Sequence, residues 1–181
     1  MSELTPEIEK LIDQRVQEAL KSTGAPPRKN RMALIASQGK LDAAYPPLII
    51  ASTAAAMDME VAIFFTFYGL YILHKKRGAN LQVPPLANPA MPMPVPNIIG
   101  ALPGMTALAT TMMKGMFSKV KVPSVPELLE MCIEGGVKII ACQMTMDAMG
   151  IKREDLIDEL EVGGAATFLG YASESSINMF M

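Results

Sequence analysis

Short apolar runs that alternate with helical segments constrain the fold of this chain more than any other feature. Four runs rich in β-branched, aliphatic and aromatic residues have the length of buried strands: 32–36, 60–67, 137–141 and 177–181. Helical patterns occupy much of the chain between them, at 41–57, 69–75, 106–120, 125–134 and 163–173. Strands that alternate with helices favour a parallel sheet with both faces covered. We therefore expect an α/β fold, with a single three-layer domain built on a mostly parallel sheet.

Prolines and capping residues set the boundaries of these helices. Pro46 and Pro47 confine the regular part of the helix at 41–57 to the residues after them, because proline removes a backbone hydrogen bond and clashes with the preceding turn. Ser124 is placed to cap the helix at 125–134, and Gly135 follows its end.

The segment at 5–22 has the pattern of an N-terminal amphipathic helix. Thr5 suits its N-cap and Pro6 its first helical position. Its apolar residues form one stripe at helical spacing: Ile8, Leu11, Ile12, Val16, Ala19 and Leu20. Glycine and prolines follow, so we expect a helix and linker at 1–30 and an α/β domain at 31–181. The stripe of such a helix packs on a neighbouring subunit or on its own domain.

A Pro- and Met-rich stretch interrupts the domain. No charged residue occurs from 78 to 113, and seven prolines fall between 84 and 103. The prolines exclude a regular helix in the first part of this stretch, whereas a membrane-spanning helix needs about 20 apolar residues in one helical run. We expect an insertion at 79–104 that forms either a lid over a site or an interface between subunits. A peripheral membrane contact is a further alternative for this apolar region.

The charge balance and the N-terminal residues limit the classes of partner and compartment. Lys and Arg number 16 against 18 Asp and Glu, a formal net charge of -2, which argues against a nucleic-acid partner. The chain begins with acidic and polar residues, where a secretory signal would be basic and then apolar. We therefore expect a cytoplasmic protein, in which a pair of cysteines is more often catalytic, redox-active or metal-binding than a structural disulfide.

Cys142 follows the predicted strand at 137–141 and precedes a short helical segment. In open parallel sheets, ligands bind beyond the carboxyl ends of the strands. Unpaired backbone N–H groups at the start of a helix stabilise a thiolate and lower its pKa. Such a thiolate is a nucleophile that can take up sulfane sulfur as a persulfide, or thiosulfate as an S-thiosulfonate. The alternative is a small buried apolar residue.

Cys132 lies ten residues earlier, in the helix that Gly135 ends. A strand rises about 3.3 Å per residue, and the helix before it runs the opposite way, so the two sulfurs are expected to lie too far apart for a disulfide. Cys132 is therefore either a core residue or a second sulfur-handling thiol.

Several other polar residues are candidate partners of Cys142. His74 ends a helical stretch and is either solvated or an acid–base partner, and carboxylates at Asp147 or Glu134 would raise the thiol pKa. Ser37 and Gly39 follow the first strand and are expected at the same sheet edge. Two cysteines and one distant histidine do not predict a metal site, and no dinucleotide or P-loop motif predicts a cofactor.

The stretch VKIIACQMTMDAMGI at 137–151 resembles the DsrE/DsrF-like family, which includes the TusD type of sulfur-relay subunit. In that family a buried strand delivers a cysteine, and a short apolar helix, a glycine and an aliphatic residue follow. Weaker similarities lie at 32–39, 61–73 and 163–181. Larger members of the family, a two-cysteine subgroup, also carry a cysteine in the place of Cys132 and a long Pro- and Met-rich insertion.

The resemblance implies a sheet of about five strands, a homo-oligomer, and sulfur transfer to or from a TusA-like carrier protein. It implies that Cys142 carries the sulfur and that Cys132 is secondary. It leaves open whether the protein is a sulfurtransferase enzyme or a sulfur carrier. Two other functions are alternatives. The apolar region at 84–117 suggests a non-enzymatic oligomeric scaffold or peripheral membrane-associated interaction protein. A peroxide-reducing thiol protein is the other, but this sequence lacks the Arg and Thr expected close before the cysteine of such a protein.

Overall fold

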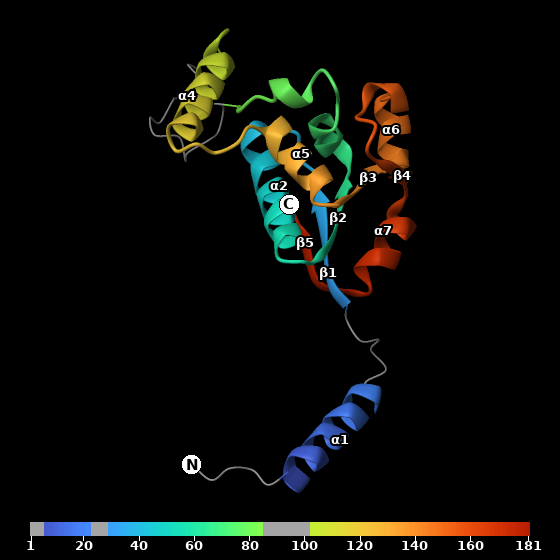
Figure 1. Ribbon diagram of the computed structural model, residues 1–181. Coiled ribbons are helices and arrows are strands. Elements are labelled where there is room, and N and C mark those ends of the chain that lie inside the picture. Colours follow the sequence, from blue (N-terminus) through green and yellow to red (C-terminus); the bar gives the residue numbers. More distant parts are fainter. Residues whose placement is uncertain (1–5, 23–28, 85–101) are drawn as a thin grey trace.

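The computed structural model describes residues 6–22, 29–84 and 102–181, and a five-stranded parallel sheet forms its centre (Figure 1). The strand order is β4-β3-β2-β1-β5, and each neighbouring pair is parallel. The strands are β1 (Lys29–Ala36), β2 (Glu60–Phe65), β3 (Lys138–Cys142), β4 (Glu161–Gly163) and β5 (Ser175–Phe180). The predicted α/β fold is confirmed.

Helices cover both faces of this sheet, with α2 and α5 on one side and α7 on the other (Figure 1). The α-helices are α1 (Pro6–Ser22), α2 (Leu41–Ala56), α4 (Met105–Lys119), α5 (Val125–Glu134), α6 (Gln143–Met149) and α7 (Ala165–Ala172). Short 3-10 helices are η1 (Phe67–Ile72), η2 (Gly78–Asn80) and η3 (Arg153–Asp155). The three layers follow from the alternation of strands and helices along the chain.

The two faces of the sheet differ in the number of side chains that they bury. On the α2 and α5 side, large aliphatic residues such as Leu34 and Ile63 are fully buried, and each stabilises the fold by about 1.5–3 kcal/mol. On the α7 side the buried set is smaller and includes Ala33, Ala62 and Cys142. The α2 and α5 side therefore provides most of the hydrophobic stabilisation, and Cys142 belongs to the thinner layer.

The expected restriction of α2 by its prolines was wrong. The helix begins at Leu41 and contains both Pro46 and Pro47. Pro47 is fully buried, and α2 packs against β1, β2 and α5. We infer that this packing offsets the hydrogen bonds that two prolines cannot donate.

The strand boundaries also differ from those expected. β1 begins three residues early, where the Arg31 guanidinium pairs with Glu60 and, at 2.7 Å, with Glu174. β3 extends one residue further, so that Cys142 is its last residue. The edge strand β4 was missed because it is short, mostly exposed and ends in a glycine.

The amphipathic N-terminal helix is confirmed as α1, although Thr5 lies outside the described residues. Four residues of its apolar stripe are exposed: Ile8, Leu11, Ile12 and Val16. Most of the predicted insertion at 79–104 also lies outside the described residues, and the division into 1–30 and 31–181 stays a prediction. Within the described ranges, none of the helices combines the length and apolar character needed to cross a bilayer.

Candidate functional site

The carboxyl ends of β2 and β3 bring together the residues of the candidate site. Phe65 of β2 is in register with Ala141 of β3, so the next residues along each strand, Thr66 and Cys142, lie side by side. Cys142 itself is in register with Gly163 of β4. It ends its strand in an extended conformation and serves as the N-cap residue of α6. The alternation of strand side chains places Cys142 on the α7 face of the sheet.

Two buried threonines meet beside this cysteine. Thr66 is 7% exposed and Thr145, in the first turn of α6, is 2% exposed. Their hydroxyl oxygens lie 3.1 Å apart and share a hydrogen bond. The backbone N–H of Phe67 donates to the Thr145 hydroxyl oxygen at 3.3 Å. Sequence reasoning missed both threonines; the only signal in the sequence was their position, one directly after a strand and one just after the cysteine.

The surroundings of Cys142 lower the pKa of its thiol. Burial is the largest single influence and raises the pKa, but hydrogen bonds oppose it. These come from the hydroxyl and backbone N–H of Thr145, the hydroxyl of Thr66 and the backbone N–H of Met144. Their sum holds the Cys142 pKa below its ordinary value, so the thiolate fraction at neutral pH is enlarged.

Cys142 lies just beneath the surface. The residue is only 4% exposed, yet its neighbour Met144 is 65% exposed. On the adjacent strand end, Phe67 and Tyr68 are 57% and 64% exposed. These exposed side chains flank the strand ends at which Cys142 lies.

Cys132 occupies the opposite side of the sheet. It is fully buried in α5 among the residues that pack against α2, and its thiol donates a hydrogen bond to the Leu48 carbonyl oxygen at 3.4 Å. Burial raises its pKa to about 11, and a backbone hydrogen bond from Ser52 offsets only part of that rise. Both cysteines are free thiols, as the sequence spacing predicts. Cys132 is therefore a neutral thiol at physiological pH.

The other residues considered from sequence have local partners. His74 follows η1, and its Nδ1 accepts a hydrogen bond from the Lys76 backbone N–H. The Asp147 carboxylate accepts a hydrogen bond from the Gln143 side chain at 2.7 Å. None of these contacts involves Cys142. Glu134 is the last residue of α5, the helix that carries Cys132.

Ser37 and Gly39 lie after β1 and line a cavity of about 470 Å³ with Tyr68 and Tyr71. Gly39 is required there, because a Cβ atom at this position would lie 2.3 Å from the Tyr68 carbonyl oxygen. Cys142 is not among the residues that line this cavity.

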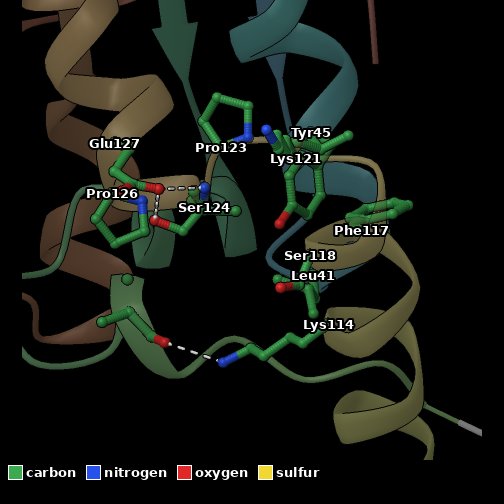
Figure 2. A pocket seen from close by; sticks show the side chains of 14 residues that line it. Leu41, Tyr45, Lys114, Phe117, Ser118, Lys121, Pro123, Ser124, Pro126 and Glu127 are labelled. Atoms are coloured by element: carbon green, nitrogen blue, oxygen red, sulfur yellow. Dashed lines mark hydrogen bonds between the residues drawn. The ribbon is translucent and has the colours of Figure 1, made fainter.

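A second cavity, of about 510 Å³, lies between α2, α4 and α5 (Figure 2). Lys114, Lys121 and Tyr45 line it, together with Ser124 and Glu127. The last two form the cap of α5, in which the Glu127 carboxylate accepts hydrogen bonds from the Ser124 hydroxyl and backbone N–H (Figure 2). None of the residues predicted to carry chemistry lines this cavity. Helix capping accounts for Ser124 and Glu127, and the Lys114 ammonium donates to the Ala79 carbonyl oxygen at 3.4 Å.

In the parts of the chain that the structure describes, no group of three or more His, Cys, Asp or Glu side chains is placed to hold a metal ion. The nucleophile that the site supplies from its own residues is the Cys142 thiolate.

Known proteins resemble this chain over nearly its whole length. The DsrE/DsrF/DrsH-like family matches residues 28–180. The protein named sulfur carrier protein DsrE2 of Allochromatium vinosum is 48% identical over 159 residues, which cover 84% of this chain and 99% of that protein. The uncharacterized protein YrkE of Bacillus subtilis is 33% identical over 154 residues, which cover 83% and 96%.

The crystal structure of the ychN protein from E. coli has a similar fold, with a TM-score of 0.54 and 11% identity, covering 85% of this chain and 99% of that one. At that identity the likeness supports the fold alone. The sequence matches confirm the resemblance found at residues 137–151, and we conclude that the chain belongs to the DsrE/DsrF/DrsH-like family.

Proposed function

We propose that this protein is a cytoplasmic sulfur carrier or sulfurtransferase, which binds sulfane sulfur covalently on Cys142 and passes it to a TusA-like partner protein. The observation that carries the proposal is a thiol of lowered pKa at the carboxyl end of β3, next to two buried hydroxyl groups. The name of the 48% identical relative, a sulfur carrier protein, supports the same role.

The proposed reaction begins with the Cys142 thiolate attacking the outer sulfur of a donor persulfide. A new S–S bond forms on Cys142, the S–S bond of the donor breaks, and the donor cysteine leaves as a thiolate. The exchange is redox-neutral and needs no cofactor. The same attack on a central sulfur of tetrathionate releases thiosulfate and leaves an S-thiosulfonate on Cys142. A partner thiolate then attacks the sulfur bonded to Cys142 Sγ, so that a new S–S bond forms on the partner, the S–S bond to Cys142 breaks, and Cys142 leaves as a thiolate.

The second thiol has a different place in this proposal. A neutral, fully buried Cys132 cannot act as a nucleophile without opening the packing between α5 and α2. We therefore assign Cys132 to the core, and its secondary sulfur-handling role stays a prediction that the next experiment tests.

Mass spectrometry of the protein after exposure to polysulfide or tetrathionate tests the proposal. We expect a mass gain of whole sulfur atoms or of a thiosulfonate group, carried by the peptide that contains Cys142. Cys142→Ser should abolish the gain, and the matched control Cys132→Ser should keep it. A gain that survives Cys142→Ser and is lost in Cys132→Ser would overturn the assignment, and sulfur found on both peptides would restore a role for Cys132.

The partner and the assembly state are part of the proposal. After loading, mixing the protein with a TusA-like carrier should move the added mass from Cys142 to the carrier. Light scattering during size-exclusion chromatography should show the homo-oligomer expected for the family. Failure of transfer with a loaded protein would reject the partner while leaving the carrier role intact.

A further inference from the structure

The buried hydroxyl groups near Cys142 differ from the other buried hydroxyl groups of the described residues in their hydrogen-bond acceptors. Within the described ranges four polar side chains are buried: Thr66, Thr110, Thr145 and Ser175. A buried hydroxyl without a hydrogen-bond acceptor destabilises the fold, so each needs a destination for its proton. The Thr110 hydroxyl donates to the Thr106 carbonyl at 2.7 Å, and Ser175 donates to the Tyr171 carbonyl at 3.0 Å.

Thr66 and Thr145 behave differently. In the part of the chain that the structure describes, neither hydroxyl donates to a carbonyl group; the two bond to one another at 3.1 Å. Two hydroxyls carry two protons, and their mutual bond uses one of them. Whichever oxygen is the donor in that bond, the other hydroxyl keeps a proton. The Cys142 sulfur, whose pKa both hydroxyls lower, lies at the adjacent strand end and is available as its acceptor.

A strained turn fixes this arrangement. Phe67 has a φ of 48°, in the left-handed region that bulky side chains avoid. In this conformation its backbone N–H donates to the Thr145 hydroxyl oxygen at 3.3 Å. This N–H occupies one of the two lone pairs of that oxygen, so the Thr145 oxygen can accept only one further hydrogen bond. Strain of this kind persists where the surrounding structure holds it, and it is commonly found at functional sites.

We propose that Thr66 and Thr145 are thiolate-stabilising residues of the site, and that the left-handed turn at Phe67 orients them so that a hydroxyl proton faces the Cys142 sulfur. The inference deepens the proposed function, because it names the groups that hold the negative charge of the sulfur between transfers. Hydroxyl donors suit this task, since they stabilise an anion without adding a competing charge.

The titratable side chains on the surrounding elements have other partners. Lys138 of β3 and Glu161 of β4 pair with each other at 2.9 Å, near the opposite end of the strands from Cys142. Asp147 of α6 bonds to Gln143, and Tyr171 of α7 lies against the Arg31 guanidinium. On η1, Tyr68 is an exposed phenol, and Tyr71 stacks with it. The hydroxyl pair is therefore the group whose removal should move the titration of Cys142.

The test is the pH dependence of iodoacetamide alkylation at Cys142, read from its peptide by mass spectrometry. Thr145→Val and Thr66→Val remove a hydroxyl at nearly constant volume, and each should raise the alkylation midpoint by about one pH unit, a roughly tenfold loss of thiolate at neutral pH. Thr145→Ser and Thr66→Ser should restore the wild-type midpoint. Thr110→Val, which removes a buried hydroxyl that donates to a carbonyl, is the matched control and should leave the midpoint unchanged.

Thermal unfolding of each variant shows that the alkylated protein is folded. If Thr145→Val does not fold, Thr66→Val decides the question, since Thr66 lies outside α6. An unchanged midpoint in a folded valine variant would overturn the inference, as would an equal shift in Thr110→Val. The alkylation midpoint is measured independently of sulfur loading. If the valine variants shift the midpoint but the wild-type protein takes up no sulfur, the proposed function is rejected and the thiolate-stabilising role of the two threonines is kept. If the wild-type protein takes up sulfur but the valine variants leave the midpoint unchanged, the proposed function is kept and the role of the threonines is rejected.

Discussion

The two cysteines of this chain have almost the same exposure and opposite chemistry. Cys132 is 0% exposed and Cys142 is 4% exposed, so access to solvent does not distinguish them. The two cysteines differ instead in whether their sulfur donates or accepts hydrogen bonds. Cys132 donates to the Leu48 carbonyl, which favours the protonated thiol, and its pKa is raised to about 11. Cys142 faces hydroxyl and amide donors, which favour the thiolate, and its pKa is lowered.

The difference follows from the layer in which each thiol lies. Cys132 lies between α5 and α2, in the thick core of large aliphatic residues, where a charge would be desolvated without compensation. Cys142 lies where a strand ends and its backbone leaves the sheet, so N–H and O–H groups from two elements are free to meet the sulfur. The comparison indicates that hydrogen-bond donors at the sheet edge, rather than exposure, determine which cysteine can react.

The largest expected effect is a difference in reactivity between the two thiols. At pH 7 a thiol with a pKa of about 11 is about one part in ten thousand ionised, whereas an ordinary thiol is a few per cent ionised. Cys142 should therefore alkylate at least about 100-fold faster than Cys132 in the native protein. Peptide-resolved mass spectrometry during a time course with iodoacetamide measures both rates. Labelling in urea, where the two should react equally, is the control, and native rates within about tenfold of each other would contradict the comparison.

The sequence predicted the positions of the two cysteines in the fold but not the hydrogen-bond donors around Cys142. A β-branched run followed by helical turns placed Cys142 at the end of a strand, and the capping pattern of Ser124 and Gly135 placed Cys132 in a helix. The bond between Thr66 and Thr145 joins residues 79 positions apart and depends on the register of β2 against β3. Sequence periodicity gives the face of a side chain but not this register, so the donors could not be predicted.

Two features of the fold escaped prediction for similar reasons. β4 has three residues and exists because β3 offers it an edge, which local sequence does not encode. The prolines of α2 are tolerated because the helix packs against the sheet and α5, a tertiary effect that outweighs local propensity.

The next expected effect is a pH-dependent loss of stability from Cys132. Its folded-state pKa, about 11, lies above the unfolded value, so its contribution is fully present below about pH 8.5 and is lost as pH rises toward 11. The loss amounts to about 3 kcal/mol of unfolding free energy when the titration is complete. Urea unfolding at pH 8 and pH 10.5 should show a smaller decrease for Cys132→Ser than for the wild type.

Cys142→Ser provides a comparison in the same measurement, because the pKa of Cys142 is shifted in the opposite direction to that of Cys132. Its lowered folded-state pKa gives a contribution that is present above the unfolded pKa and is lost as pH falls through the folded value. Cys142→Ser should therefore show the same alkaline decrease as the wild type, and the pH dependence of its unfolding free energy should differ from that of the wild type only below about pH 8.5. An alkaline decrease that is identical in the wild type and Cys132→Ser would show that Cys132 is not held neutral by the core.

The smallest expected effect tests whether the two layers are independent. Ser124→Ala removes the cap of α5, whose hydroxyl bonds to Glu127 at 2.7 Å, and should lower the unfolding free energy by about 1 kcal/mol. Since α5 packs on the face opposite Cys142, the alkylation midpoint of Cys142 should not change, while the rare labelling of Cys132 should increase about fivefold if it proceeds through opening of the fold. Peptide-resolved labelling of this variant measures both. A shifted alkylation midpoint of Cys142 would mean that the α5 cap affects the opposite face of the sheet. The reactivity of Cys142 would then depend on the packing of α2 and α5 as well as on the hydrogen-bond donors around its sulfur.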